Sequence, residues 1–291
     1  MTRNLVGTVV KAVGGVFTVV CNGKKYTCFS PKKFRYQQLD ILVGDHVEFE
    51  DLHRGKGVVT TVIPRKNRLV RPEIANVDVC FLVLASVPEP DFFLADKVLI
   101  NCFQENIEPV IIVNKMDLDT STMSKVVENY STIADIVPVS ALDQASVLAL
   151  GKYIQGKTVC FAGQSAVGKT SLLNVLLPST NGEVGGISQK SGRGMHTTRH
   201  SSLHAVLGGY VADTCGFSLC ELQGIRSDEL RLYLDDFVTI ARQCKYTSCT
   251  HTAEPDCAVK LAVEDGKLCK DRYLRYLEEF AELKEAEKNQ Y

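Results

Sequence analysis

One stretch of this 291-residue sequence decides the fold of its central part: Gly163-Gln164-Ser165-Ala166-Val167-Gly168-Lys169-Thr170. The stretch matches the pattern G-x-x-x-x-G-K-[ST] without a gap. It follows an apolar run at residues 158–162, which has the composition of a buried strand, and it opens a helical pattern at residues 169–177. A glycine-rich turn between a strand and a helix directs backbone N–H groups inward, where they bind phosphate. The sequence therefore predicts a phosphate-binding loop at the start of a helix.

The residue types in this loop have separate expected roles. Gly163 and Gly168 let the backbone turn around the phosphates. Lys169 neutralises the β- and γ-phosphates, and Thr170 offers its hydroxyl to Mg²⁺. We expect nucleotide contacts from the loop and from the residue after it, that is from Gly163, Gln164, Ser165, Ala166, Val167, Gly168, Lys169, Thr170 and Ser171.

A second motif, Asn114-Lys115-Met116-Asp117, fits N-K-x-D and follows an apolar run at residues 110–113. The Asp117 carboxylate can accept hydrogen bonds from N1–H and the exocyclic amine of guanine. Adenine lacks that pair of donors and would leave the carboxylate unsatisfied, so the motif favours GTP over ATP. Ser140-Ala141, after the apolar residues 137–139, fits the auxiliary loop that contacts the base.

The order of these two motifs is unusual. In ordinary small GTPases the phosphate loop comes first and the guanine motif lies near the end of the domain. In this chain residues 114–117 precede residues 163–170. All parts of a GTP site are present, so we interpret the central part as a circularly permuted GTPase domain.

The two segments that sense the γ-phosphate are also identifiable. Asp213-Thr214-Cys215-Gly216 fits D-x-x-G, so Asp213 is expected to hold Mg²⁺ through water and the Gly216 N–H to contact the γ-phosphate. In Ras-like enzymes the residue after D-x-x-G is a glutamine that orients the attacking water. In this chain the corresponding residue is Phe217. His196, in a glycine-rich segment at residues 192–198, is our candidate for that role because an imidazole can orient water near neutral pH. The alternative is a solvated histidine in a surface loop.

The N-terminal part has the pattern of a small β-barrel. Its strand-like runs are rich in β-branched or aromatic residues and lie at residues 6–10, 16–21, 25–29, 46–50 and 57–63. Gly14-Gly15 and Asn22-Gly23 occupy hairpin-turn positions. Five short strands in about seventy residues predict a barrel of the OB type.

The remaining sequence divides into two further segments. Apolar runs at residues 77–85 and 110–113 alternate with helical patterns, as at residues 94–105, which predicts a doubly wound α/β domain. From Ile225 onward the pattern is helical, with Ser227 as a possible cap of a helix to about Gln243 and a last helix from about Asp271. We therefore expect a multidomain α+β protein: an OB-type barrel at 1–70, a permuted P-loop GTPase domain at 71–224 and a zinc-binding helical domain at 225–291.

Charge is distributed unevenly along the chain. Residues 1–72 contain thirteen Lys or Arg against five Asp or Glu, although the whole chain has a net charge of −1. A basic barrel favours a polyanionic partner such as nucleic acid. The alternative is a small β domain that simply places lysine on exposed faces and edges. The expected RNA contacts are Lys32, Lys33, Arg35, Arg65, Lys66 and Arg68.

A cluster of metal-binding residue types lies near the C-terminus. Cys244, Cys249, His251 and Cys257 supply three thiols and an imidazole within fourteen residues, which indicates a closed, structural Zn²⁺ site. The other seven of the eleven cysteines show no comparable spacing, so a chance cluster is the weaker interpretation. No long apolar run and no signal-peptide pattern is present, so we expect a cytoplasmic protein without a membrane partner. A monomer is the default expectation.

At this point the whole chain resembles the RsgA (YjeQ) family of small-subunit-dependent ribosomal GTPases. The words that carry the resemblance are Arg65-Lys66-Asn67-Arg68-Leu69-Val70-Arg71-Pro72, Ala75-Asn76-Val77-Asp78, Asn114-Lys115-Met116-Asp117, Gly163-Gln164-Ser165, His196-Thr197-Thr198 and the Cys/His cluster with Glu254-Pro255. The resemblance implies late maturation of the 30S subunit, binding of 16S rRNA, and GTP hydrolysis stimulated by the subunit. It assigns water positioning to His196 and Mg²⁺ sensing to Thr198. Cys215, Arg199 and Ala166 depart from the family pattern, where proline, threonine and glycine are usual.

Two other interpretations stay open from the sequence. One is an RNA-binding protein whose GTP site is a sensor with negligible turnover, in which replacing His196 would change no measured activity. The other is an enzyme or regulator that acts on a different RNA. Salt-dependent binding to rRNA and to an unrelated RNA would separate them.

Overall fold

The computed structural model describes residues 4–31, 40–70, 73–177, 201–213, 221–222 and 224–289. The chain forms two compact units, each assembled from segments that are distant in the sequence. Unit 1 comprises Met1–Val79, Asp143–Phe161 and Lys169–Phe217. Unit 2 comprises Cys80–Leu142, Ala162–Gly168 and Ser218–Tyr291.

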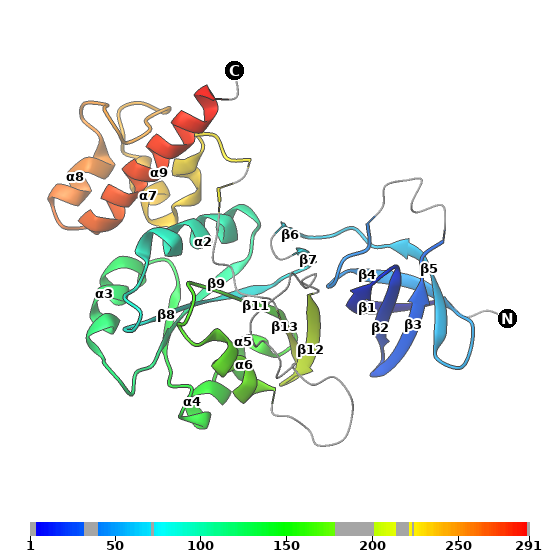
Figure 1. The fold of residues 1–291 in the computed structure, drawn as a ribbon. Coiled ribbons are helices and arrows are strands. Elements are labelled where there is room, and N and C mark those ends of the chain that lie inside the picture. Colours follow the sequence, from blue (N-terminus) through cyan, green and yellow to red (C-terminus); the bar gives the residue numbers. More distant parts are fainter. Residues whose placement is uncertain are drawn as a thin grey trace. The chain divides into compact units, whose positions relative to one another are not determined.

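The N-terminal part of unit 1 is a closed barrel (Figure 1). Its strands are β1 (Asn4–Val13), β2 (Val16–Cys21), β3 (Lys24–Phe29), β4 (His46–Asp51) and β5 (Lys56–Val62). They pair in the order β1-β2-β3-β5-β4, and β4 pairs back with β1. Alternate side chains point inward, so Val9, Val19 and Phe49 are fully buried. This confirms the expected five-stranded barrel.

The rest of unit 1 contains a short hairpin and part of an α/β domain. Its strands are β6 (Arg68–Val70), β7 (Glu73–Ala75), β11 (Thr158–Ala162), β12 (Ser202–Val206) and β13 (Gly209–Asp213), and its helices are α4 (Gln144–Leu148), α5 (Gly151–Ile154) and α6 (Lys169–Leu176). Strand β11 pairs in parallel with β13, and β12 pairs antiparallel with β13. Because β11 is buried along its whole length, its apolar run is that of a strand covered on both faces.

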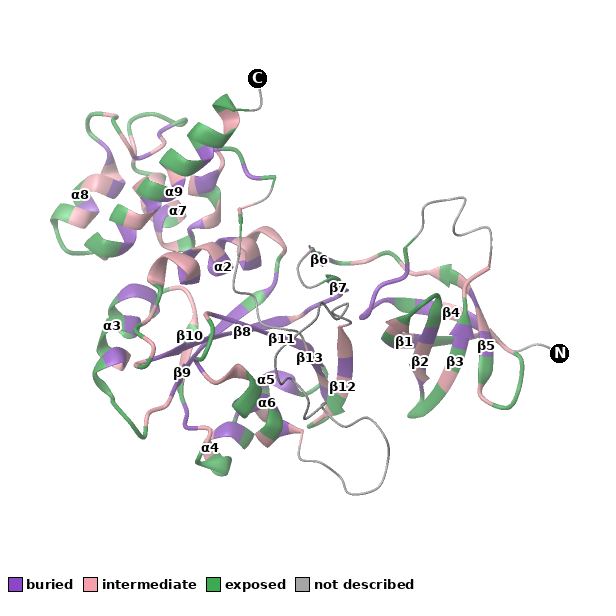
Figure 2. Cartoon of the chain, in the orientation of Figure 1, coloured by how far each residue is buried: buried purple, intermediate pink, exposed green. Residues whose placement is uncertain are grey.

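Unit 2 contains alternating strands and helices. They are β8 (Val79–Ala85), α2 (Phe92–Gln104), β9 (Glu108–Asn114), α3 (Ser121–Tyr130) and β10 (Asp135–Pro138). The strands lie in the order β10-β9-β8, and β10 is parallel to β9. Figure 2 shows β8 and β9 as almost continuously buried, in agreement with their apolar sequence. The alternation confirms the predicted α/β architecture.

The C-terminal part of unit 2 is helical, but one expected helix is wrong. The chain forms a short 3₁₀ helix η1 (Leu230–Tyr233), α7 (Asp235–Ala241), α8 (Ala258–Glu264) and α9 (Lys270–Lys288) in place of one helix from Ser227 to Gln243. The break lies at Leu234, whose backbone is extended (φ −114°, ψ 93°) and whose side chain is buried in the helical core. Ser227 caps no helix, because its N–H and hydroxyl donate to the Glu287 carboxylate at 2.7 and 2.9 Å.

The longest described helix, α9, is amphipathic. It buries Tyr273, Tyr276 and Leu283 and exposes a charged face. No helix in the described part of the chain combines the length and the apolar character that crossing a membrane requires.

Candidate functional site

Asn114 joins three loops of unit 2. It is the last residue of β9 and is 1% exposed. Its Nδ2 donates to the Val167 carbonyl oxygen at 2.8 Å, and its Oδ1 accepts from the Ala141 N–H at 3.2 Å. One side-chain amide therefore connects the guanine motif, the phosphate loop and the auxiliary base loop. The motifs that are reversed in sequence order meet in space.

Lys115 adds a second connection between the same segments. Its backbone is left-handed, with a φ of 61°. Its Nζ donates to the carbonyl oxygens of Ala166 at 2.9 Å and Val87 at 2.6 Å. The side chain thus ties the phosphate loop to the segment that follows β8.

Asp117 lies at the surface next to the auxiliary loop. The carboxylate is exposed, and its Oδ1 accepts a hydrogen bond of 2.5 Å from the Ser140 hydroxyl. The backbone N–H of Met116 donates to the Val139 carbonyl oxygen at 3.2 Å, which holds the motif against that loop. The carboxylate is therefore positioned by Ser140 and accessible to an incoming base.

The phosphate loop at residues 163–168 needs glycine at two positions. At Gly163 (φ 127°) a Cβ would lie 2.3 Å from the Val83 carbonyl oxygen, and at Gly168 (φ 99°) one would lie 2.3 Å from Asn114 Nδ2. Ala166 also has a positive φ, of 65°. A left-handed conformation costs an L-residue about 1–2 kcal/mol, so the loop holds local backbone strain at Ala166.

The remaining phosphate and magnesium residues that are described belong to unit 1. Lys169, Thr170 and Ser171 form the first turn of α6, and Asp213 is the last residue of β13. Since β11 and β13 are parallel neighbours, their carboxyl ends meet at one edge of the sheet, where α/β domains bind ligands. Partial burial lowers the pKa of Lys169, and an anion at this position would compensate for the lost hydration.

Several expected site residues lie outside the described residues. They are His196, Thr198 and Gly216 of the γ-phosphate segments, and Lys32, Lys33 and Arg35 of the barrel. Their assignments stay predictions.

The basic residues beside the barrel that are described make protein contacts. Arg65 forms a two-point ion pair with Asp45, which is fully buried, at 2.6 and 2.8 Å. A hydrogen bond with Asp45 raises the pKa of Arg65. Lys66 pairs with Asp78, and Arg68 pairs with Glu73 at 3.1 Å on the surface. Arg65 therefore anchors the segment after the barrel, and an RNA contact from it would compete with that ion pair.

The sequence did not single out residues 87–91, which contact both nucleotide motifs. Gln164 Nε2 donates to the Glu89 carbonyl oxygen at 2.9 Å, and Gln164 Oε1 accepts from the Asp91 N–H at 2.7 Å. The sequence could have indicated this segment only by its position after the carboxyl end of β8, because ligand sites of α/β sheets lie at the carboxyl ends of strands.

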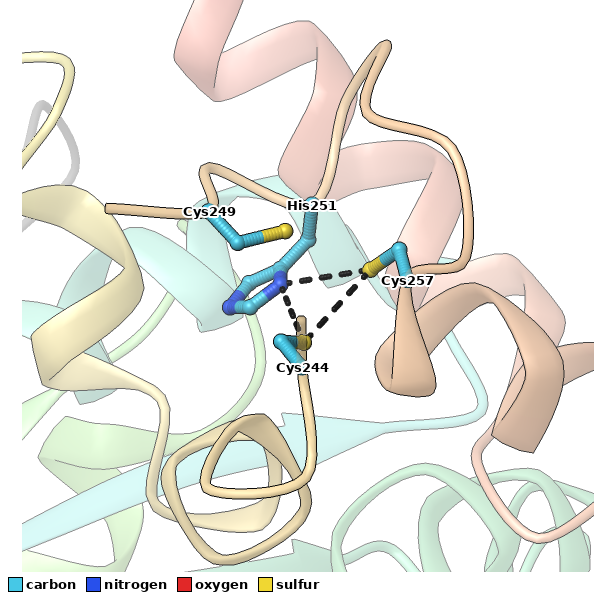
Figure 3. Close-up of side chains that lie close together, drawn as sticks. All are labelled: Cys244, Cys249, His251 and Cys257. Carbon is cyan, nitrogen blue, oxygen red and sulfur yellow. Dashed lines mark hydrogen bonds between the residues drawn. The ribbon is translucent and has the colours of Figure 1, made fainter. Parts of the chain in front are cut away.

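The cysteine and histidine cluster forms one compact centre in unit 2 (Figure 3). The ligand atoms of Cys244, Cys249, His251 and Cys257 all lie within 4.8 Å of one another. Cys244 Sγ is 3.9 Å from Cys257 Sγ, and His251 Nδ1 is 3.7 and 3.4 Å from these two sulfur atoms. Around an ion with metal–sulfur bonds of about 2.3 Å, tetrahedral ligand atoms are separated by ~3.5–3.8 Å. The cluster can therefore hold one metal ion through four ligands.

Burial favours the neutral forms of the Cys249 thiol and the His251 imidazole. Burial raises the pKa of Cys249 to about 12, and burial together with the positive charge of Arg231 lowers the pKa of His251 to about 4. A neutral imidazole is the form that binds metals. A cation among the thiols would favour thiolate, so metal binding would release protons.

The loop that carries His251 is fixed by hydrogen bonds. Burial alone would raise the pKa of Glu254, but bonds from Thr250 and Thr252 lower it to about 2. Its oxygens accept from the N–H groups of Thr250 at 2.6 Å and Thr252 at 2.9 Å. From α9, the Tyr273 hydroxyl donates to the His251 carbonyl oxygen at 2.8 Å. Hydrogen bonds to Glu254 and from Tyr273 thus orient the loop that presents His251 to the other three ligand residues.

Comparisons with known proteins agree with this architecture. Two family models match consecutive parts of the chain, RsgA N-terminal domain over residues 6–59 and RsgA GTPase over residues 62–223. The "Small ribosomal subunit biogenesis GTPase RsgA" of Geobacillus sp. (strain WCH70) is 43% identical over 286 residues, which is 96% of this chain and 97% of the relative. The protein of the same name from Thermotoga neapolitana is 41% identical, with 90% of each chain covered.

Solved structures show the same fold. The crystal structure of YjeQ from Thermotoga maritima superposes with a TM-score of 0.85 at 36% identity and covers 97% of this chain and 99% of its own. YloQ, described as a circularly permuted GTPase, superposes with a TM-score of 0.84 at 34% identity and covers 98% of this chain and 96% of its own.

The barrel, the reversed order of the nucleotide motifs and the C-terminal Cys/His cluster together define a circularly permuted GTPase with two accessory modules. Such an enzyme hydrolyses GTP on loops that Asn114 and Lys115 hold together. The chain belongs to the RsgA family of GTPases.

Proposed function

We propose that this chain acts late in maturation of the 30S small ribosomal subunit, binds its 16S rRNA, and hydrolyses GTP faster when the subunit is bound. The observation that carries the proposal is the junction at Asn114, which brings a guanine motif and a phosphate loop into one site in a chain of the RsgA family. The names of its relatives supply the small subunit as the target. The proposed place of action is the cytoplasm, and the proposed active form is a monomer.

The nucleotide chemistry follows from the residue types. Asp117 would recognise guanine, and the backbone N–H groups of residues 163–168 would bind the phosphates with Lys169. Thr170, Thr198 and Asp213 are the proposed Mg²⁺ residues, and the ion would neutralise charge on the β- and γ-phosphates. The Gly216 N–H would contact the γ-phosphate. His196 would orient the attacking water, since Phe217 has no polar group for that purpose.

We assign zinc to the Cys/His centre. Three thiols and one imidazole with no open position are the donor set of a structural zinc site, so one Zn²⁺ per chain is proposed. We further propose three functional domains, at residues 1–70, 71–224 and 225–291, of which the third depends on the metal.

The proposed RNA contacts are basic residues of the N-terminal part of the chain. Lys32, Lys33, Arg35, Lys66 and Arg68 would contact phosphates, and each such contact should steepen the salt dependence of binding. We assign Arg65 a supporting part, because the Asp45 carboxylate already holds its guanidinium.

The test is GTP hydrolysis by the purified chain alone, and then with small subunits, large subunits or free RNA. The His196→Ala variant tests the catalytic assignment, and His200→Ala, which removes a histidine four positions away, is the matched control. We expect stimulation by small subunits only, loss of the stimulated rate in His196→Ala, and retention of it in His200→Ala. Tight GTP binding without stimulation by small subunits would contradict the proposal and favour a sensor or a different RNA partner.

A further inference from the structure

We propose that Gln164 is a positioning residue that couples nucleotide in the phosphate loop to helix α9 and thereby to the metal-bearing segment. The inference rests on the proposed GTPase function and adds to it a route between two sites. Every contact that carries it lies among described residues of unit 2.

The first step is the contact between the phosphate loop and the start of α2. Gln164 binds two backbone groups of the segment before that helix, the Glu89 carbonyl oxygen and the Asp91 N–H. Asp91 is also the N-cap of α2, since its side chain accepts from the Leu94 N–H at 2.9 Å. Gln164 thus holds the residue that begins the helix.

The second step lies within the same helix, at Asp96. This carboxylate is 2% exposed, and it accepts from Arg272 at 3.0 Å on one oxygen and from Arg275 on the other. Both arginines belong to α9, which lies beside α2 (Figure 1). Because a buried carboxylate cannot be left without its partners at low cost, a displacement of α2 has to carry α9 with it.

The third step connects α9 to the metal centre. Tyr273 donates to the His251 carbonyl oxygen, and Tyr276 donates to the Thr250 carbonyl oxygen. The loop that contains the candidate metal ligand His251 is therefore hydrogen-bonded to α9, the helix whose arginines bind Asp96.

A ligand shifts this arrangement only if it favours one state of the phosphate loop. The loop is suited to that, because it holds Ala166 in a left-handed conformation that Lys115 fixes through the Ala166 carbonyl oxygen. Phosphates bound to the loop's N–H groups would stabilise this conformation. Through the hydrogen bonds of Gln164, bound phosphates would also stabilise the first turn of α2 in the position that Asp91 caps.

Hydrogen–deuterium exchange on the full chain, with and without GDP, tests the route. In the native chain we expect GDP to slow exchange in the phosphate loop, in the first turn of α2 and in residues 270–280 of α9, by ~5-fold or more at the last two sites. Gln164→Ala keeps the backbone N–H that the proposal assigns to the phosphates and removes only the side chain that binds Glu89 and Asp91. At a GDP concentration that saturates the variant, exchange should still slow at residues 163–168 and 114–117, but the slowing in α2 and α9 should be lost. Gln144→Ala, which changes an exposed glutamine at the start of α4, should behave as the native chain.

The Gln164→Ala variant without nucleotide should keep the native exchange rates in α9, which separates loss of coupling from loss of folding. Full GDP-dependent slowing of α9 in that variant would overturn the inference. So would a native chain in which GDP protects the phosphate loop and leaves α9 unchanged. A native chain that GDP protects nowhere would overturn the proposed GTPase function together with this inference, so the two failures are distinguishable.

Discussion

The nucleotide loops and the metal centre lie in one unit but are constructed in opposite ways. The nucleotide loops are joined by an amide and an ammonium that bind backbone carbonyl groups, while Asp117 and Ser165 stay exposed. The metal ligands Cys249 and His251 are 2% and 1% exposed. The first construction permits a ligand to enter and leave, and the second suits a ligand that stays. We therefore expect the nucleotide to exchange and a metal ion in the Cys/His centre to be a lasting component of the fold.

Removal of the metal should have the largest effect. A chelator or the Cys249→Ala substitution should unfold the C-terminal helical segment, because structural zinc sites contribute on the order of 10 kcal/mol to folding. GDP should still bind, and its affinity should change by about 150-fold at most, the upper end of coupling between separate sites. Limited proteolysis of the C-terminal segment and fluorescence titration with a labelled GDP measure the two effects.

Cys269→Ala is the matched control for this experiment, because Cys269 is half-buried and lies outside the ligand set. It should leave both measurements unchanged. If the chelated protein kept its C-terminal helices intact, the metal would not be part of the fold and the contrast between the two sites would fail.

The buried ion pairs should give the next largest effect. Arg272, 2% exposed, binds Asp96 at 3.0 Å and Asp236 at 2.9 Å. Arg272→Met leaves buried carboxylates with fewer partners and should lower the free energy of unfolding by about 3–5 kcal/mol. Arg226→Met removes an ion pair whose partners are 69% and 54% exposed, and it should change the stability far less, because water screens exposed charges. Chemical denaturation monitored by circular dichroism compares the two variants, and equal losses would mean that the buried cluster stabilises the fold no more than a surface ion pair does.

The residues of the nucleotide loops and of the metal centre could both be predicted from the sequence. Both the guanine motif and the phosphate loop follow from backbone requirements within a few residues, as at Gly163 and Gly168, so their residue types could be read directly. The metal ligands could be found for the same reason, since four ligands lie within fourteen residues. The barrel strands followed from alternation and from turn signals such as Asn22-Gly23, both with positive φ.

Contacts between distant segments could not be predicted. Nothing in the sequence around Asp96 indicates that Arg272, 176 positions later, is its partner. The break at Leu234 has the same origin, because burial of its side chain in the helical core, a tertiary effect, overrides a helical pattern. The sequence predicts an RNA contact at Arg65, but it does not indicate that the buried Asp45 carboxylate is the partner of this guanidinium. In each case the missing information is which side chains meet, and local spacing does not contain it.

Glu279, in helix α9, should make the stability of the folded chain depend on pH. Its carboxyl oxygens are buried without a hydrogen-bond partner among the described residues, and burial, with a smaller contribution from Asp96, raises its pKa from 4.5 to about 9. The folded chain then keeps a proton that the unfolded chain releases, so this stability is complete below about pH 4.5 and is lost as the pH rises toward 9. Glu279→Gln removes the penalty, and its stability advantage over the native chain should grow by about 2–3 kcal/mol between pH 5 and pH 7.

Denaturation midpoints at a series of pH values measure this difference. Glu278→Gln is the matched control, because it makes the same change at an exposed neighbour and should show no such trend. An advantage of Glu279→Gln that is constant with pH would mean that Glu279 is ionised in the folded chain. The buried cluster would then carry one additional negative charge.

The smallest effect is expected in the phosphate loop, at Ala166. Its φ of 65° is unfavourable for alanine and acceptable for glycine, so Ala166→Gly should raise the free energy of unfolding by about 0.5–1 kcal/mol. The hydrogen bond from Lys115 uses the Ala166 carbonyl oxygen, which the substitution keeps, so the gain isolates backbone strain. Ala145→Gly, in α4, should change the stability in the opposite direction by a similar amount, because glycine weakens a helix. If both variants lost stability, the left-handed conformation at residue 166 would carry no strain. The phosphate loop without nucleotide would then be as free of backbone strain as the loop of the metal centre, and the contrast between the two loops would fail.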